Sequence, residues 1–268
     1  MKVAYDIIIL AGQSNAEGSG LGRVGKKFKE NDLIMEMVDV NRKEMMLEDN
    51  GKLNLIQPFE LSIGFAKEDP HEYGLRGNLA HSFAEEYIKK GYLKEGRKVL
   101  IVKTAVGGTG FAKNHWGKGN ILSERMYHMI DSALSTCDDS KIVAFLWHQG
   151  ESDAFENEEL SSKARESFYF DKFDYLISTV RQKYGDDFPI VAGGFTAEWS
   201  ALYKEQCEAV YRATKRVLKM HNGAFVDTRY LKSNNQDFQN GDNIHFCKKA
   251  LIKLGRMYFD KYQKLINN

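Results

Sequence analysis

Short, nearly continuous apolar runs alternate along the chain with longer amphipathic stretches, and this alternation restricts the possible folds more than any other feature. Apolar runs without a polar face are typical of parallel strands that helices cover on both sides of a sheet. The runs are Tyr5–Leu10, Lys98–Thr104, Ile142–Trp147, Ile190–Phe195 and Ala224–Asp227. The pattern predicts an α/β protein, with a parallel sheet of about five strands in a three-layer α/β/α sandwich.

Between these runs, apolar residues recur at the spacing of helices that pack one face onto a sheet. The stripes are Leu79, Phe83, Tyr87 and Ile88; Phe173, Leu176, Ile177, Val180 and Tyr184; Val210, Ala213, Val217 and Leu218; and Leu251, Leu254, Tyr258 and Tyr262. Residues 20–78 break the alternation with glycine, asparagine and charged residues around a strand-like run at 33–40. We expect an irregular insertion there, over the carboxyl ends of the strands, within a single domain of residues 1–268.

Composition excludes several classes of function. With 268 residues, 43% of them hydrophobic, the chain can bury a sizeable core. A net charge of +1 favours neither nucleic acid nor an acidic membrane surface as a partner. The longest apolar run falls far short of the roughly 20 residues of a membrane span, and the start lacks a secretory pattern, so we expect a cytoplasmic protein. Three widely spaced cysteines, Cys137, Cys207 and Cys247, suit reduced thiols rather than disulfides or a zinc site.

The first candidate site is the segment Gly12-Gln13-Ser14-Asn15-Ala16-Glu17-Gly18, directly after the first apolar run. A serine in such a turn stands above the sheet edge, where it can act as a nucleophile. The alternative that this segment is an ordinary polar turn with no catalytic role is not excluded by the sequence. The α/β-hydrolase elbow fits poorly, because there the serine follows a strand in the middle of the sheet. A G-x-G-x-x-G run at residues 20–25, with Asp39 further on, lacks the helix that a dinucleotide site needs.

Three more segments follow strands or precede the last helix. Asp242 and His245, three residues apart, suit an orienting carboxylate and a general base, although helix capping by Asp242 stays open. Gln149, in the segment Trp147-His148-Gln149-Gly150-Glu151-Ser152-Asp153, can donate an amide N–H to an oxyanion. The run from Ala105 to Gly110 offers backbone N–H groups, and no G-K-[ST] follows it as in a phosphate loop. His148, Glu151 and Asp153 lack the spacing of a metal site, so no metal or other cofactor is expected.

All four segments are expected at one edge of the sheet, and their order is specific. Gly-Gln-Ser-Asn, Gly-Gly-Thr, His-Gln-Gly-Glu-x-Asp and Asp-x-x-His-Phe, over residues 12–246, resemble the SGNH hydrolases. The resemblance is strongest to their sialate O-acetylesterase and acetylxylan esterase branch, carbohydrate esterase family 6. It implies a flavodoxin-like sheet and a serine esterase that removes O-acetyl groups from carbohydrates through an acetyl-enzyme, without a cofactor.

Carried over by position, the resemblance makes Ser14 the nucleophile, His245 the base and then the acid, and Asp242 the residue that orients His245. The backbone N–H groups of Ser14 and Gly108, together with the Gln149 side chain, would form the oxyanion hole. Gln13, Asn15, Gly107 and Glu151 would support the site. Ala16-Glu17 departs from the branch, which often has methionine followed by a small residue there.

The substrate is expected to be a small acetylated carbohydrate, and both xylan-type and sialic-acid-type sugars stay open, as does the oligomeric state. Trp116 and Trp199 are candidates for stacking on a sugar ring, or else packed loop anchors. An esterase or thioesterase for a non-carbohydrate acyl group would share the same residues. A binding protein without catalysis would not need the serine, histidine and aspartate together.

Overall fold

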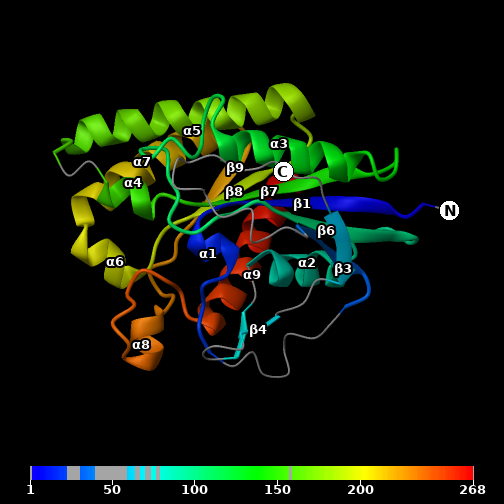
Figure 1. Cartoon of the computed structure of the whole chain (residues 1–268), viewed down its shortest axis with the longest axis horizontal. Coiled ribbons are helices and arrows are strands. Elements are labelled where there is room, and N and C mark those ends of the chain that lie inside the picture. The colour runs from blue at the N-terminus through cyan, green and yellow to red at the C-terminus, as the bar shows by residue number, and fades with distance from the viewer. Residues whose placement is uncertain are drawn as a thin grey trace.

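The computed structural model describes residues 2–22, 31–39, 59–63, 67–69, 74–76, 79–156 and 159–267 (Figure 1). A seven-stranded sheet lies at its centre, in the order β3-β2-β6-β1-β7-β8-β9. Its strands are β1 (Ala4–Gly12), β2 (Ile34–Asp39), β3 (Phe59–Ile63), β6 (Arg97–Lys103), β7 (Lys141–His148), β8 (Ile190–Gly193) and β9 (Gly223–Val226). Each adjacent pair is parallel except β2 and β3, so six strands run the same way and β3 is an antiparallel edge.

The five strands expected from the sequence are β1, β6, β7, β8 and β9, and they lie side by side in the order β6-β1-β7-β8-β9. Numbered along the chain among themselves, this is the 2-1-3-4-5 order of flavodoxin-like sheets. After β1 the chain forms β2, β3 and β6 on one side of this strand, and it then crosses to form β7 on the other side. The carboxyl ends of β1 and β7 therefore form the switch point at which such sheets bind their ligands.

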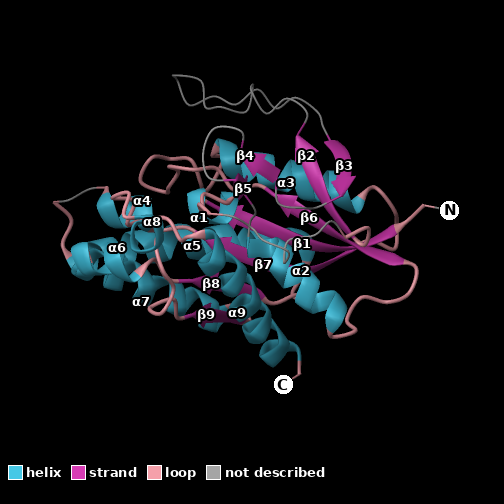
Figure 2. Cartoon of the chain, turned by 90° about the horizontal axis from the view of Figure 1, so that it is seen from below, coloured by secondary structure: helices cyan, strands magenta, loops and turns pink. Residues whose placement is uncertain are grey.

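Helices cover both faces of the sheet, as the apolar stripes predict (Figures 1 and 2). One face carries α2 (Leu79–Lys89) and α9 (Lys248–Ile266), and the other carries α3 (Ile121–Leu134), α5 (Ser162–Tyr184) and α7 (Lys204–Met220). Side chains of β1 alternate between the two layers: Ile8 and Leu10 pack with α2 and α9, and Ile7 and Ile9 with the opposite helices. The three-layer α/β/α prediction is confirmed.

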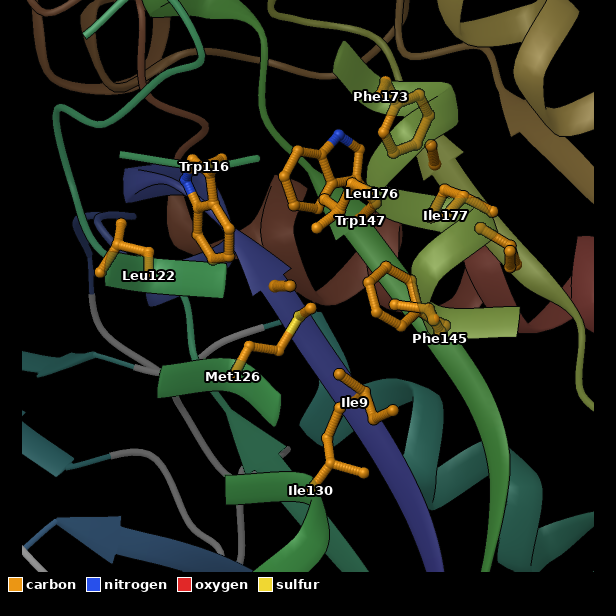
Figure 3. Close-up of a cluster of buried hydrophobic side chains, with 14 of the residues drawn as sticks. Ile9, Trp116, Leu122, Met126, Ile130, Phe145, Trp147, Phe173, Leu176 and Ile177 are labelled. Atoms are coloured by element: carbon orange, nitrogen blue, oxygen red, sulfur yellow. The ribbon is translucent and has the colours of Figure 1, made fainter. Parts of the chain in front are cut away.

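Large aromatic rings fill the layer between the sheet and α3, α5 and α7 (Figure 3). Trp147, near the end of β7, stacks on Phe173 of α5 with 5.2 Å between ring centroids. Trp116 meets the same Trp147 ring edge-on at 5.2 Å. This packing fixes the end of β7, from which the next segment of the site begins.

The stretch expected to be an insertion adds strands to the sheet. The run at 33–40 contains β2, which pairs with β6, and β3 pairs with β2 in turn, so the sheet is two strands wider than expected. A separate two-stranded sheet joins β4 (Lys67–Asp69) and β5 (Gly74–Arg76). The remainder of residues 20–78, including Gly25 of the glycine-rich run, lies outside the described residues, apart from 20–22 and 31–33.

The described loops contain short helices, namely α1 (Ser14–Glu17), α4 (Glu151–Phe155), α6 (Ala197–Leu202) and α8 (Asn234–Phe238). Two of them lie directly behind central strands: α1 begins two residues after the end of β1, and α4 begins three residues after the end of β7. None of the helices in the described ranges combines the length and the apolar character needed to cross a bilayer.

Candidate active site

The structure brings the four predicted segments together at the carboxyl edge of the sheet. Ser14 follows β1, the glycine run follows β6, and Gln149 follows β7. Asp242 and His245 lie in the loop between α8 and α9, on the same side (Figure 1). The segments that meet here are up to 231 positions apart along the chain.

A close approach of β1 to β7 shapes the turn that carries Ser14. Gly12 has a φ of +135°, and a Cβ there would lie 2.1 Å from the carbonyl oxygen of His148. The next residue, Gln13, donates its backbone N–H to that oxygen at 3.0 Å. Only glycine fits between the strands, so the chain turns sharply and places Ser14 at the start of α1. Ser14 is buried but retains 8% of its exposure.

Ser14, His245 and Asp242 form a continuous chain of hydrogen bonds. The Ser14 Oγ lies 2.9 Å from His245 Nε2. The other ring nitrogen, His245 Nδ1, is 3.0 Å from both carboxylate oxygens of Asp242. Because the carboxylate accepts the Nδ1 proton, Nε2 is left with the lone pair that can take a proton from the serine. This is the geometry of a nucleophile, a base and an orienting acid.

Asp242 is held as a carboxylate by groups beyond the histidine. Asn234 Nδ2 donates to its Oδ2 at 2.8 Å, and the His245 backbone N–H donates to its Oδ1 at 3.2 Å. Burial by itself would raise the pKa of Asp242, but the hydrogen bonds from His245 and Asn234 outweigh it and lower the pKa. Asn234 was not among the sequence candidates, because nothing in its local sequence marks it as a partner of Asp242.

Asn15, next to the nucleophile, holds the histidine loop on both sides of His245. Its Oδ1 accepts the Phe246 backbone N–H at 3.0 Å, and its Nδ2 donates to the Ile244 carbonyl at 3.1 Å. The same Nδ2 donates to Glu151 Oε1 at 2.7 Å. Asn15 is fully buried, so these bonds are protected from water. They join the serine turn directly to the loop that carries the base.

Glu151 and His148 form a buried pair beneath the site. The Nε2 of His148 lies 3.7 Å from Glu151 Oε1, and both residues are fully buried. The opposite nitrogen, His148 Nδ1, is 2.8 Å from the Tyr258 hydroxyl. Burial lowers the pKa of His148 to about 3 and raises the pKa of Glu151, so both side chains favour their neutral forms.

The glycine run after β6 supplies a backbone donor beside the serine. Gly108 has a φ of +71°, and a Cβ built on it would meet no atom within 4 Å, so this residue borders open space. Neither its N–H nor the Ser14 N–H has an acceptor within the described part of the chain. The preceding N–H, that of Gly107, donates to Glu17 Oε2 at 2.8 Å. The N–H groups of Gly108 and Ser14 can therefore serve as backbone donors of an oxyanion hole, whereas the Gly107 N–H is already bonded to Glu17.

Gln149 is buried and already hydrogen-bonded in the free protein. Its Nε2 donates to Asp153 Oδ2 at 2.7 Å, with Gln13 Oε1 at 3.1 Å and the Thr109 carbonyl at 3.2 Å. Its Oε1 accepts from the Tyr169 hydroxyl at 3.1 Å. An amide has two hydrogens, so a role as an oxyanion donor requires it to exchange one of these acceptors for the substrate.

Asp153 holds the glycine run in place, a role that sequence reasoning did not assign to it. Its carboxylate accepts the backbone N–H groups of Phe111 at 3.0 Å and Ala112 at 2.7 Å, besides the Gln149 amide. Burial raises the pKa of Asp153, although these hydrogen bonds oppose the shift. Among the described residues, no three histidine, cysteine, aspartate or glutamate side chains gather in a way that could hold a metal ion.

The two tryptophan candidates differ. Trp116 is fully buried and donates its Nε1 to Thr109 Oγ1 at 3.1 Å, so its ring faces are covered by protein. Stacking of Trp116 on a sugar was the wrong expectation, because the residue is a packed anchor of the loop after β6. Trp199, in α6, is half-buried and lies 4.4 Å from the Tyr203 ring centroid. Its part in sugar binding stays a prediction.

Several solved structures have the same fold. NanS aligns with a TM-score of 0.74 and 16% identity over 98% of both chains. A protein from Arabidopsis thaliana aligns with a TM-score of 0.66 and 21% identity over 99% of both chains. A carbohydrate acetylesterase from Xanthomonas citri gives 0.63 and 16%, covering 97% of this chain and 56% of the other. At these identities the likeness shows a shared fold. No curated protein sequence matches significantly.

A flavodoxin-like sheet with a Ser-His-Asp chain at its carboxyl edge is the arrangement of SGNH-type hydrolases. Residues 4–264 match the family described as "Carbohydrate esterase, sialic acid-specific acetylesterase". The chain belongs to this family of carbohydrate acetylesterases, which confirms the resemblance drawn from its four motifs.

Proposed function

We propose that this protein removes O-acetyl groups from a small carbohydrate, with Ser14 as the nucleophile. The observation that carries the proposal is the unbroken hydrogen-bonded chain from Ser14 Oγ through His245 to Asp242. Its family supplies the substrate class, an acetylated carbohydrate. A binding protein would gain nothing from a base aligned on a serine hydroxyl, so hydrolysis fits this geometry better than binding alone.

In the first half of the reaction, Ser14 Oγ attacks the acetyl carbonyl while His245 Nε2 takes its proton. The carbonyl oxygen becomes an oxyanion, which the N–H groups of Ser14 and Gly108 stabilise, with the Gln149 amide as a third donor. His245 then gives the proton to the sugar oxygen, the ester bond breaks, and the sugar alcohol leaves. The acetyl group remains on Ser14 as an ester.

In the second half, a water molecule attacks this ester while His245 takes one of its protons. The proton passes to Ser14 Oγ as the acyl bond breaks, acetic acid is released, and the site returns to its starting state. Asp242 keeps the imidazole in one orientation throughout and stabilises its charged form. The lowered pKa of Asp242 supports this role, because the group remains a carboxylate at neutral pH.

Hydrolysis of p-nitrophenyl acetate by the wild type and by Ser14→Ala tests the proposal. We expect turnover to be abolished in Ser14→Ala and retained in the control Ser135→Ala, which changes an exposed serine at the end of α3. Mass spectrometry of the enzyme trapped during turnover should find the acetyl group on Ser14. Wild-type turnover in Ser14→Ala, or an acetyl group on another residue, would contradict the assignment.

The sugar itself is identified by a direct comparison. Initial rates on O-acetyl sialic acid and on acetylated xylo-oligosaccharides, measured side by side, separate the two kinds of substrate that the catalytic residues would share. We expect the O-acetyl sugars to be hydrolysed with a higher kcat/KM than p-nitrophenyl acetate. A preference for the aryl ester or for an acyl thioester over every sugar would favour a non-carbohydrate esterase instead.

A further inference from the structure

Glu17 joins the nucleophile helix to the glycine run after β6. It lies three residues after Ser14 in α1, and its Oε2 accepts the Gly107 N–H at 2.8 Å. A Cβ on Gly107 would lie 3.0 Å from this Oε2 and 3.5 Å from the Ser14 Cβ, so the run packs directly onto both side chains. This carboxylate is therefore in contact with the residue that precedes the Gly108 donor.

We propose that Glu17 is a positioning residue that sets the Gly108 N–H relative to Ser14. The inference rests on the proposed esterase function and deepens it. An oxyanion hole with donors on two separate segments works only if those segments keep a fixed separation, and misplacement by about 1 Å can cost about 100-fold in rate. The segments here are α1, which carries Ser14, and the run from Ala105 to Gly110.

The far side of the glycine run already has its own anchors. The Thr109 carbonyl accepts from Gln149, and the Phe111 and Ala112 N–H groups donate to Asp153. These contacts tie the run to the segment after β7. On the side of Ser14, the Val106 N–H donates to the Gly12 carbonyl at 3.1 Å, and Glu17 takes the next N–H along. Gly108 thus lies between two anchored neighbours and is held at both ends.

The position of the acceptor, rather than its charge, is what this role requires. A glutamine at residue 17 keeps an oxygen that can accept the Gly107 N–H, whereas an alanine removes it. A negative charge near a developing oxyanion opposes it, so loss of the charge alone should not slow the reaction. Glu17→Gln and Glu17→Ala therefore separate positioning from charge.

We expect Glu17→Ala to lower kcat for p-nitrophenyl acetate by about 10- to 100-fold, with KM changed by less than about threefold. The kcat of Glu17→Gln should remain within about twofold of the wild-type value, because the conservative variant retains the oxygen that accepts the Gly107 N–H. Glu124→Ala, a change at an exposed glutamate of α3, is the matched control and should leave both constants unchanged. A structural defect alone would lower thermal stability without this division between kcat and KM.

The Gly107→Ala variant tests the same contact from its other side. As a single change, with Glu17 retained, the new methyl group at residue 107 presses on Glu17 Oε2 and should lower kcat. In the Glu17→Ala background that atom is gone, so the same change should cost no more than about twofold. Additive effects of the two changes would overturn the proposal. It would also be overturned by a wild-type kcat in Glu17→Ala, or by equal losses in Glu17→Ala and Glu17→Gln.

Failure of the esterase proposal would look different. In that case the wild type itself would not hydrolyse acetyl esters, or Ser14→Ala would retain turnover. If Glu17→Ala does not fold, two other variants still decide the question, because both retain a side-chain oxygen at residue 17. They are Glu17→Gln and Gly107→Ala. An intact rate in Gly107→Ala would then contradict the role of this contact.

Discussion

Asn15 Nδ2 donates a hydrogen bond to Glu151 Oε1 at 2.7 Å, across 136 positions of the chain. The bond joins the turn after β1 to the helix after β7, at the point where the fold places its ligand site. Because Asn15 also bonds the backbone on both sides of His245, one side chain connects three of the four segments. The alignment of Ser14 and His245 therefore depends on Asn15, although Asn15 does no chemistry itself.

Asn15→Ala should both destabilise the protein and slow turnover. The change leaves Glu151 Oε1 and the Phe246 N–H without their partner, and an unpaired buried polar group costs about 1–3 kcal/mol. The loop of His245 also loses two of its contacts, so kcat should fall by at least about tenfold. Denaturant unfolding and steady-state kinetics measure the two effects. An unchanged kcat would show that the loop keeps its place without Asn15.

Gln149→Ala distinguishes an oxyanion donor from a structural brace. If the amide turns to the substrate, its removal should lower kcat by about 100- to 1,000-fold. If it only braces Thr109 and Asp153, stability should fall while kcat for the folded enzyme stays within about threefold. The measurement is kcat together with the denaturation midpoint. Asp153→Asn, which disturbs the same brace without touching the substrate, is the matched comparison.

Stability should depend on pH through His148. An unfolded histidine has a pKa near 6.5, and burial lowers the pKa of His148 to about 3. Between these values the unfolded chain binds a proton that the folded chain excludes, so this contribution is fully present above about pH 6.5. It is lost by about 1.4 kcal/mol per pH unit as the pH falls toward 3.

The His148→Asn variant isolates this effect from other titrating groups. We expect the free energy of unfolding of the wild type to fall more steeply between pH 6 and pH 4 than that of the variant. Both proteins are measured by urea unfolding at each pH. Parallel curves would mean that His148 is charged in the folded protein, paired with Glu151.

The sequence predicts the frame of this protein better than its contacts. The strands ending at Gly12 and His148 follow from their apolar runs, and Ser14, His245 and Asp242 from motifs at strand ends. The helix at Ile121–Leu134 was not predicted, although Leu122, Met126, Met129, Ile130 and Ala133 recur along it at helical spacing. The strand-like run at 33–40 corresponds to β2, whereas the edge strand β3 was not predicted, because it lies in the stretch where glycine and charged residues break the apolar alternation.

Other parts of the site depend on the direction of side chains, which the sequence does not carry. Asn234 reaches Asp242, and Glu17 reaches Gly107, only because tertiary packing aims them there. The direction of the Trp116 ring could not be predicted for the same reason: the residue follows a strand end, yet its ring points into the core. Proximity to a strand end predicts the edge of the sheet on which a residue lies, and nothing about which way its ring faces.

Trp116→Ala should therefore act on stability rather than on sugar affinity. Removing a fully buried tryptophan leaves a cavity beside Trp147 and should cost about 3–5 kcal/mol. Trp199→Ala, on the half-buried ring of α6, should cost less stability and, if that ring stacks on sugar, should raise KM for the acetylated sugar. Urea unfolding and KM measured on both variants give the comparison. A raised KM with unchanged stability in Trp116→Ala would contradict its place as a core anchor.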